Sequence, residues 1–491
     1  MKQKSFYLFI SVVLTSFLVS CNSFLNKEPI SQLTNSTLGK STANDSVRFT
    51  TAAQAEALLA TCYGDFRTEM YELDCFVNGD MHSDNSYYGA EGNPDYPQID
   101  NYNVSATNGN ITRDWQDLYT MVSHCNTVII NVPKISDPAL TDQRKTQIVA
   151  EASFIRAWAY FDLVRMYGNV PLILKEVPAI NAQNISQVYP ILYPPQVSDS
   201  TVYNQIITDL QTALPSVPSI ALNKGFVTKG AVNALLAKVY ATMEPHNWQQ
   251  VSNYCDAVIN GGYSLLPNYD WLWDGQHKNS SEAIFEINYD GNWSTGTGDW
   301  GASMFVGTDW KKFNTPSHAL VNAFLAAGDQ VRYKSSILWQ NVSGIWTDSH
   351  WNTNNYPFCY KIRDAQSATS DIILLRLADI ILLKAEALNE LGQTSQAAVY
   401  LNQIRHRVGL PNTPATTQSE MRLAIENERF LELAFEGQRW FDLVRTGRAV
   451  AVLNSVENGL YKGKVTSNML VYPIPQNQLD LNQNLKQNPG Y

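Results

Sequence analysis

The stretch "IILLRLADIILLKAEALNELG" occupies residues 372–392 and is apolar on nearly every side. Such a segment predicts a helix that is buried over most of its surface, and Gly392 is placed to end it. A second amphipathic helix follows, with apolar residues three and four positions apart at Ala397, Leu401, Ile404 and Val408. Two helices joined by a short glycine turn within about 40 residues have the size of a tetratricopeptide-type unit. The sequence therefore predicts a helix pair here.

A five-residue phrase, Phe-Asp-Leu-Val-Arg, occurs twice, at 161–165 and at 441–445. Each copy closes a predicted amphipathic helix just before a glycine, Gly168 or Gly447. Within each copy Phe and Val are three residues apart and can share a buried face. Asp and Arg are also three apart, and such a pair stabilises a helix by about 0.2–0.5 kcal/mol. We interpret the phrase as a repeated packing unit and not as a repeated active site.

Helical periodicity is lost from about 263 to 360, yet eight of the twelve tryptophans lie in that region. A second loop-like stretch, 78–103, mixes tyrosines with Asp, Asn and Gly. Because loops on a rigid scaffold often carry function, we expect these two stretches to form a ligand-binding lobe.

The amino-terminus reads as an export signal. Lys2 and Lys4 precede an apolar run from Ser5 to Ser20, and polar sequence follows at once, which is typical of a signal peptide and not of a membrane span. The signal ends in "LVSC", which resembles a bacterial lipobox with Cys21 as the lipidated residue; an ordinary signal peptide is the alternative. Acyl chains on Cys21 would hold the protein at a membrane surface without spanning it.

The net charge of −10 argues against nucleic acid as a partner, because proteins that bind nucleic acid carry basic patches. It argues equally against tight docking on an anionic lipid surface.

Glu428, Glu432 and Glu436 form an acidic stripe at four-residue spacing. Paired carboxylates are the machinery of glycoside hydrolysis, so the stripe is a candidate catalytic site. Three arginines lie close to it in the sequence: Arg429, Arg439 and Arg445. Since the segment is helical and its neighbours resemble core residues, we interpret the stripe as a structural ion-pair network.

The motif "GTGDWG" at 296–301 fits the glycine pattern of a dinucleotide site. An indole lies inside it and no helix is predicted to follow, so we interpret it as a loop. The sequence also lacks the zinc-protease, serine-hydrolase and phosphate-loop motifs. We therefore expect no catalytic residue, no cofactor and no metal.

Aromatic residues interleaved with Asp, Asn and Gly suit one kind of ligand. A sugar ring has an apolar face of C–H groups and a belt of hydroxyls. Trp and Tyr supply flat, stiff surfaces, and Asn and Asp can meet the hydroxyls with hydrogen bonds. The stretch 289–310 holds both ingredients at high density. The alternative is that these indoles pack in the core.

Five motifs, taken in order, resemble those of one known family. They are the lipobox at Cys21, "AEASFIRAWAYFDLVRMYGNVPLI", "LLRLADIILLKAEALNELG" with "LNQIRHRVGLP", "ERFLELAFEGQRWFDLVRTGRA" and the terminal "QNPGY". The match runs from the signal peptide to Tyr491. On these motifs the chain resembles the SusD/RagB family of Bacteroidetes outer-membrane lipoproteins.

The resemblance implies a mainly α fold in which tetratricopeptide-like helix pairs support an irregular, loop-rich ligand-binding lobe. It implies a non-enzymatic protein on the cell surface, anchored in the outer membrane through Cys21. Such a protein captures an oligosaccharide or polysaccharide and delivers it to a SusC-like TonB-dependent transporter.

The predicted organisation has a signal peptide at 1–20, a tether at 21–45 and a body at 46–491. Within the body, the helical scaffold is expected mainly at 46–70, 112–260 and 370–450, and the ligand-binding lobe mainly at 75–110 and 263–360. By position in this lobe, seven residues are predicted to contact the glycan: Asp84, Asn85, Tyr87, Tyr88, Trp293, Trp300 and Trp310.

Two alternatives remain open. Some relatives take peptides, and Lys311 and Lys312 beside Trp310 could meet charged peptide termini. The other alternative is a glycoside hydrolase that uses buried carboxylates.

Overall fold

The computed structural model describes residues 49–89, 92–178, 183–292, 294, 296–306, 312–363, 368–455 and 464–491. The predicted signal peptide, the tether and Cys21 lie outside these residues, as do Trp293, Trp310 and Lys311. Within the described ranges no helix is both long and apolar enough to cross a membrane.

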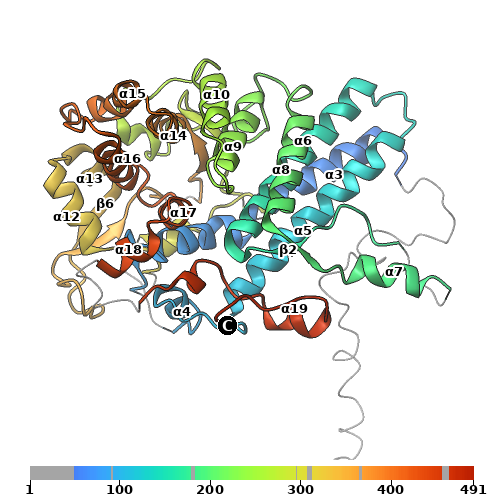
Figure 1. The fold of residues 1–491 in the computed structure, drawn as a ribbon, viewed down its shortest axis with the longest axis horizontal. Coiled ribbons are helices and arrows are strands. Elements are labelled where there is room, and N and C mark those ends of the chain that lie inside the picture. The colour runs from blue at the N-terminus through green and yellow to red at the C-terminus, as the bar shows by residue number, and fades with distance from the viewer. Residues whose placement is uncertain are drawn as a thin grey trace, which may run out of the picture. The chain divides into compact units, whose positions relative to one another are not determined.

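Four helices pack together in the first half of the described chain: α3 (Ala52–Gly64), α5 (Gly109–Asn131), α6 (Asp142–Tyr167) and α8 (Asp199–Ala213). Helix α6 lies between α5 and α8, and α3 crosses both α5 and α6 (Figure 1). The Thr141 hydroxyl accepts a hydrogen bond from the Arg144 amide and so caps the start of α6. Gly168, with φ of 70°, ends this helix as predicted.

The second group of helices continues the helix pairs: α9 (Lys229–Tyr240), α10 (Trp248–Ile259), α14 (Leu377–Glu390), α15 (Thr394–Arg407) and α16 (Gln418–Glu432). Each packs on its neighbours in series, α9 on α10, α10 on α14, and α14 on both α15 and α16 (Figure 1). The predicted pair is α14 with α15, joined at Gly392, where φ is 77°. The mainly α fold with helix pairs is therefore confirmed.

The prediction that residues 372–392 form one helix is wrong at its start. Strand β8 (Ile372–Arg376) pairs antiparallel with β4 (Ala283–Ile287), and α14 begins only at Leu377. The run Ile-Ile-Leu-Leu is short, apolar and partly β-branched, so periodicity alone does not separate strand from helix. The partner strand lies about 90 positions earlier in the sequence, as Ala283↔Arg376 in the register shows.

The two copies of the repeated phrase meet in space. The guanidinium carbon of Arg165 lies 4.1 Å from the ring centre of Phe161 and 4.2 Å from that of Phe441. Arg165 also forms the predicted ion pair with Asp162. The second copy lies in α17 (Arg439–Arg445), where Arg445 pairs with Asp442 at 2.8 Å. The phrase is thus a packing unit in which one copy contacts the other.

Three helices lie where periodicity predicted none: α11 (Ala302–Phe305), α12 (His318–Ala327) and α13 (Gln330–Ser336). Helix α11 directly follows "GTGDWG", so the expectation that no helix follows this motif is wrong. Helix α12 starts at the Ser317 cap and ends at Gly328. These helices are too short for the pattern of a long amphipathic helix to show.

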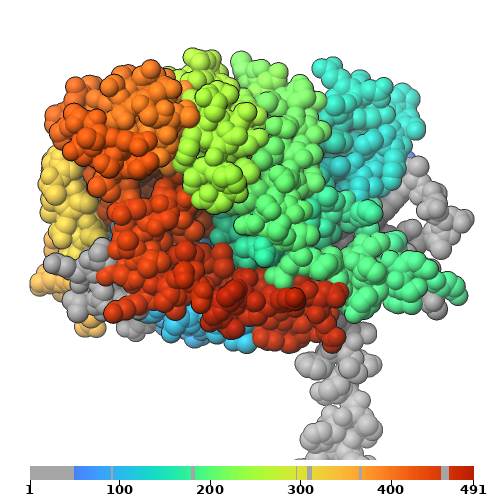
Figure 2. All heavy atoms as spheres, viewed as in Figure 1, coloured from blue at the N-terminus to red at the C-terminus, as the bar shows by residue number. Residues whose placement is uncertain are grey.

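The remaining helices are short: α4 (Tyr96–Asp100), α7 (Ile185–Leu192), α18 (Ala449–Ser455) and α19 (Gln476–Leu481). The other strands are β1 (Ser86–Tyr87), β2 (Val170–Pro171), β3 (Gln196–Val197), β5 (Thr315–Pro316), β6 (Ile337–Gln340) and β7 (Tyr356–Cys359). They pair in antiparallel twos, β1 with β5, β2 with β3, and β6 with β7. Figure 2 shows the C-terminal residues in red as a band that reaches the green residues near 190, where the Asn482 and Asn484 amides donate to main-chain carbonyls.

Candidate functional site

The segment that contains "SDNSYY" is anchored to the helical scaffold by two buried carboxylates. Asp80 accepts hydrogen bonds of 2.7 Å from the Gly437 amide and from the Asn85 side chain. Asp84 accepts two from the Arg439 guanidinium, at 2.7 and 2.8 Å. Burial raises the pKa of Asp80 to about 7, although both hydrogen bonds oppose this change. These contacts hold the start of the lobe against the end of the scaffold.

Four of the predicted site residues lie in this anchored segment, and their side chains are buried or half-buried. Asn85 is fully buried and Asp84 is 8% exposed, so both side chains face the protein interior. Tyr87 is buried and Tyr88 is half-buried. As ligand contacts these four residues stay a prediction, and the structure assigns Asp84 and Asn85 a part in holding the lobe in place.

Tyr87 belongs to a cluster of aromatic and polar side chains around one carboxylate. Strand β1 pairs with β5, and the loop 341–355 joins β6 to β7 beside them. The Asp348 carboxylate in this loop accepts hydrogen bonds from the hydroxyls of Tyr87, at 2.9 Å, and Tyr356, at 3.0 Å. It also accepts from the amides of His350 and Trp351, at 2.8 and 3.0 Å. The Asp348 carboxylate therefore fixes the loop to strand β1, through Tyr87, and to strand β7, through Tyr356.

Two half-buried indoles, Trp346 and Trp351, lie on the same loop as this carboxylate. The Trp351 indole nitrogen donates to the Pro316 carbonyl at 2.9 Å, and its ring centre lies 3.6 Å from that of His318. Trp346 is also half-buried, and the Lys312 ammonium lies 4.7 Å from its ring centre. We call Tyr87, Trp346, Asp348, His350, Trp351 and Tyr356 the aromatic cluster.

Sequence reasoning chose none of the loop 341–355 as ligand contacts. The sequence pattern that indicates a sugar site is nevertheless present in this loop, because "WTDSHW" at 346–351 interleaves indoles with Asp and His as 289–310 interleaves them with polar residues. Because Trp and Gly are denser at 289–310, the sequence favoured that stretch for the ligand contacts. Pairing of β1 with β5, which brings Tyr87 to this loop, joins residues 228 to 230 positions apart and leaves no local pattern.

Trp300 lies in a second, separately braced loop. It is half-buried and packs against the main core, and its amide lies 3.5 Å from the Glu72 carboxylate. Asp299 accepts from the Gly301 amide at 2.7 Å and donates its own amide to the Ala368 carbonyl at 2.8 Å. Burial, and then the charge of Asp299, raises the pKa of Glu72 to about 7.

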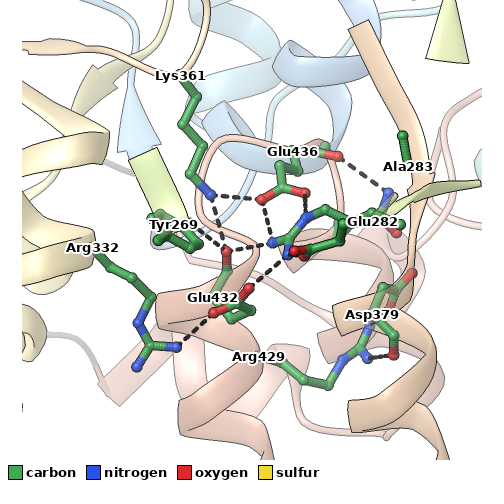
Figure 3. Close-up of polar contacts among 12 residues, drawn as sticks. Tyr269, Glu282, Ala283, Arg332, Lys361, Asp379, Arg429, Glu432 and Glu436 are labelled. Carbon is green, nitrogen blue, oxygen red and sulfur yellow. Dashed lines mark hydrogen bonds and ion pairs between the residues drawn. The ribbon is translucent and has the colours of Figure 1, made fainter. Parts of the chain in front are cut away.

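The acidic stripe lies at the centre of a buried ion-pair network (Figure 3). The Glu432 carboxylate accepts from Arg376 at 2.6 Å, from Arg332 at 2.9 Å, and from Arg407. Lys361 pairs with Glu436 at 2.6 Å, and burial lowers the pKa of Lys361 to about 8. The side chains of Glu432 and Arg332 are fully buried, so the central carboxylate of the stripe does not face solvent.

The network is as predicted, but its cations are not the sequence neighbours of the stripe. Arg429 binds Asp379 and Asp442, while Arg445 binds Glu386 and Asp442. Arg429 follows Glu428 directly on α16 and therefore points to another side of that helix, whereas Arg445 lies on the separate helix α17. The cations that meet the stripe come from β8, α13, α15 and the segment after β7: Arg376, Arg332, Arg405, Arg407 and Lys361.

A shallow depression is lined by residues other than those of the aromatic cluster. Its lining includes Trp440, His82 and Tyr472, whose rings stack in parallel, with 3.8 Å between the centres of the first two. Its lining residues leave no enclosed space even for a water molecule, so this depression cannot hold an oligosaccharide.

A scaffold of tetratricopeptide-like helix pairs that carries a loop-built aromatic lobe defines a class of helical-repeat proteins. Two family models match this chain, one described as "SusD family" over residues 340–491 and one as "Starch-binding associating with outer membrane" over residues 23–241. The chain belongs to the SusD/RagB family.

Relatives match along the whole chain. The SusD-like protein P38 of Formosa agariphila is 26% identical, with 98% of each chain covered. The starch-binding protein SusD of Bacteroides thetaiotaomicron is 34% identical over 125 residues, which is 25% of this chain and 22% of that protein. Among solved structures, a laminarin-binding SusD-like protein has a TM-score of 0.75 and 26% identity, covering 90% of this chain and 100% of the other. The surface glycan-binding protein A of Bacteroides fluxus, at 23% identity and a TM-score of 0.74, shows the same fold over 90% of this chain and 100% of its own.

Proposed function

We propose that this protein binds glycan chains in the loop-rich lobe and performs no chemistry on them. The observation that carries the proposal is the aromatic cluster, in which Asp348 fixes half-buried indoles on a loop beside two short strands. Flat, half-buried indole surfaces beside the part-exposed side chains of Asp348 and His350 match the apolar face and hydroxyl belt of a sugar ring. A SusD-like relative of similar fold binds laminarin, a polysaccharide, which supports the same ligand class.

The buried network supports a binding role over hydrolysis. Each carboxylate of the acidic stripe is held by at least one cation, and a hydrolase needs two carboxylates that reach the substrate from opposite sides. The described residues also contain no group of three His, Cys, Asp or Glu side chains arranged to hold a metal ion.

Peptide cargo has less support from the structure. Lys312, one of the two lysines that could meet a peptide terminus, is 3% exposed and lies over the Trp346 ring. Its ammonium therefore braces the cluster and does not face solvent.

The further steps of the proposed role follow the family. We infer that Cys21 carries the lipid that holds the protein at the outer membrane, exposed at the cell surface. The captured glycan would then pass to a SusC-like TonB-dependent transporter. Replacing Cys21 by Ala should release the protein from the membrane fraction, and the wild-type protein should co-purify with a transporter of that class.

The binding proposal is tested by electrophoresis in native gels that contain laminarin, starch or other polysaccharides. Protein that starts after Cys21 should be retarded by one class of glycan. Trp346→Ala and Trp300→Ala should weaken this retardation, which also tests the predicted part of Trp300. The matched control is Trp248→Ala at the start of α10, a half-buried indole on the scaffold, which should bind like wild type. Absence of retardation by every glycan would refute the proposal, and a peptide-library pull-down would then test the peptide alternative.

A further inference from the structure

One tryptophan lies outside the aromatic cluster and outside the core. Trp271 is 36% exposed, the most exposed of the tryptophans that the structure describes. It belongs to the one-turn helix η5 (Tyr269–Leu272), whose other apolar side chains, Tyr269 and Leu272, are buried with Trp273 in a cluster against Val408 and Leu410. The exposed indole gains less hydrophobic stabilisation than these three buried neighbours, and its outward position leaves it accessible to a ligand.

The indole is held still by a second ring. The imidazole of His277 lies parallel to Trp271, with 4.5 Å between ring centres and 10° between planes. Asp274 fixes that imidazole, because one carboxylate oxygen contacts the ring nitrogen Nδ1 at 2.8 Å. The other oxygen accepts from the amides of Gln276 and His277, at 2.8 and 3.1 Å, which closes the turn.

The base of this turn is fixed to the body of the protein. Asp270 accepts hydrogen bonds from the Ser335 hydroxyl at 2.7 Å and from the Arg363 guanidinium at 2.5 and 3.1 Å. Asn268 caps the start of the one-turn helix by accepting from the Asp270 amide at 3.0 Å. A ligand that binds Trp271 therefore meets a preformed surface and pays little ordering entropy.

The polar groups beside the indole identify the kind of ligand. Within the described part of the chain, the Trp271 indole nitrogen and His277 Nε2 have no hydrogen-bond partner, so both are available to hydroxyl groups. The residues that follow along the turn, from Gln276 to Ser281, are all polar or charged, which is unlike the apolar surroundings of a protein–protein hot spot. The Asp274 carboxylate beside His277 opposes an anionic ligand, whereas the charge of Asp270 is compensated by Arg363.

We propose that Trp271 and His277 form a second glycan-binding site, which holds an uncharged stretch of the same polysaccharide chain that the aromatic cluster binds. This inference rests on the proposed function. The two sites belong to separate packing clusters, one around Tyr269 and Trp273 and the other around Tyr356 and Phe358, so each is built independently. A long chain that spans both would be held more tightly than a short one, because its second contact is intramolecular.

The test compares single variants on a polysaccharide and on short oligosaccharides of the same sugar. Trp271→Ala should weaken retardation by laminarin about fivefold, the size expected for loss of one aromatic platform. It should leave unchanged the affinity for a short oligosaccharide that binds at the aromatic cluster. Binding at that cluster is identified by its loss in Trp346→Ala. Trp271→Phe should recover part of the loss, and His277→Ala should reproduce part of it. Thermal unfolding shows that each variant is folded.

Oxidative footprinting with mass spectrometry measures directly whether a ligand covers Trp271. Laminarin should protect Trp271 from hydroxyl radicals, whereas an anionic polysaccharide such as alginate should not. If the wild-type protein binds laminarin through Trp346 while Trp271→Ala binds as tightly and Trp271 stays unprotected, the second site is refuted alone. If the wild-type protein binds no glycan, the proposed function itself fails.

Discussion

Replacing Glu432 by Gln should destabilise the fold strongly. Glu432 is fully buried, and its carboxylate accepts hydrogen bonds from three guanidiniums, those of Arg332, Arg376 and Arg407. These three guanidiniums hold the pKa of Glu432 well below its usual range, against the effect of burial. The variant keeps the shape of the side chain, removes its charge and replaces one acceptor oxygen by an NH2 donor.

The charges of the network set the size of the effect. Among the described residues, its contacts connect five cations with five carboxylates: Arg332, Arg376, Arg405, Arg407 and Lys361 with Glu282, Asp329, Glu428, Glu432 and Glu436. The network is therefore neutral, and Glu432→Gln leaves one buried positive charge without a counter-charge. Breaking a buried pair in this way costs about 3–5 kcal/mol.

Urea unfolding at pH 7 measures this loss directly. The matched control is Glu426→Gln on the same helix, where a part-exposed carboxylate pairs with Arg448 at 2.9 Å and the expected cost is below about 1 kcal/mol. The double variant Glu432→Gln with Arg407→Gln restores neutrality and should be less destabilised than the two single effects added together. A loss of less than about 1 kcal/mol for Glu432→Gln would refute the account of the network as a neutral buried unit.

Three other predictions follow from contacts in and behind the lobe. Asp348→Ala should weaken glycan retardation as Trp346→Ala does. It should also cost about 1–3 kcal/mol in urea unfolding, because it leaves the buried Tyr87 hydroxyl without its acceptor. Equal retardation of the Asp348→Ala variant and the wild-type protein would contradict this prediction. Glu72 has a folded pKa near 7, above its usual 4.5, so its contribution to stability is complete below pH 4.5 and is lost as the pH rises through 7. Thermal unfolding of Glu72→Gln between pH 5 and 8 should therefore show a smaller fall in Tm than wild type. Gly79→Ala should cost about 1–3 kcal/mol in urea unfolding, since its Cβ would lie 2.1 Å from a backbone carbonyl oxygen, whereas Gly64→Ala has open space and should be neutral or stabilising.

Helices long enough to show a periodic apolar face could be predicted from the sequence, along with their ends. The apolar spacing of α15 and the glycine turn at Gly392 are local properties, and they gave the helix pair correctly. The start of α14 could not be predicted in the same way. Whether Ile372 to Arg376 extends a helix or forms a strand depends on β4, a partner far away in the sequence.

The candidate site could be predicted as a region but not as a set of contacts. Composition placed the aromatic residues in loops, and the structure shows indoles there. Whether a given side chain faces ligand or interior depends on its partner, as Asp84 illustrates, because its partner Arg439 lies 355 positions later. Asp348 was missed for the same reason, since its role depends on two tyrosines brought together by strand pairing.

The anchoring of the lobe by the end of the chain has a consequence for the order in which the protein folds. The contacts of Asp80 with Gly437 and of Asp84 with Arg439 span 357 and 355 positions. Closing a flexible loop of that length costs about 5 kcal/mol in chain entropy, and contacts this distant slow folding. The helix pairs between them can form as each is synthesised, which shortens the loop. The lobe, although its first segment is made early, acquires its buried partners only when nearly the whole chain has been synthesised.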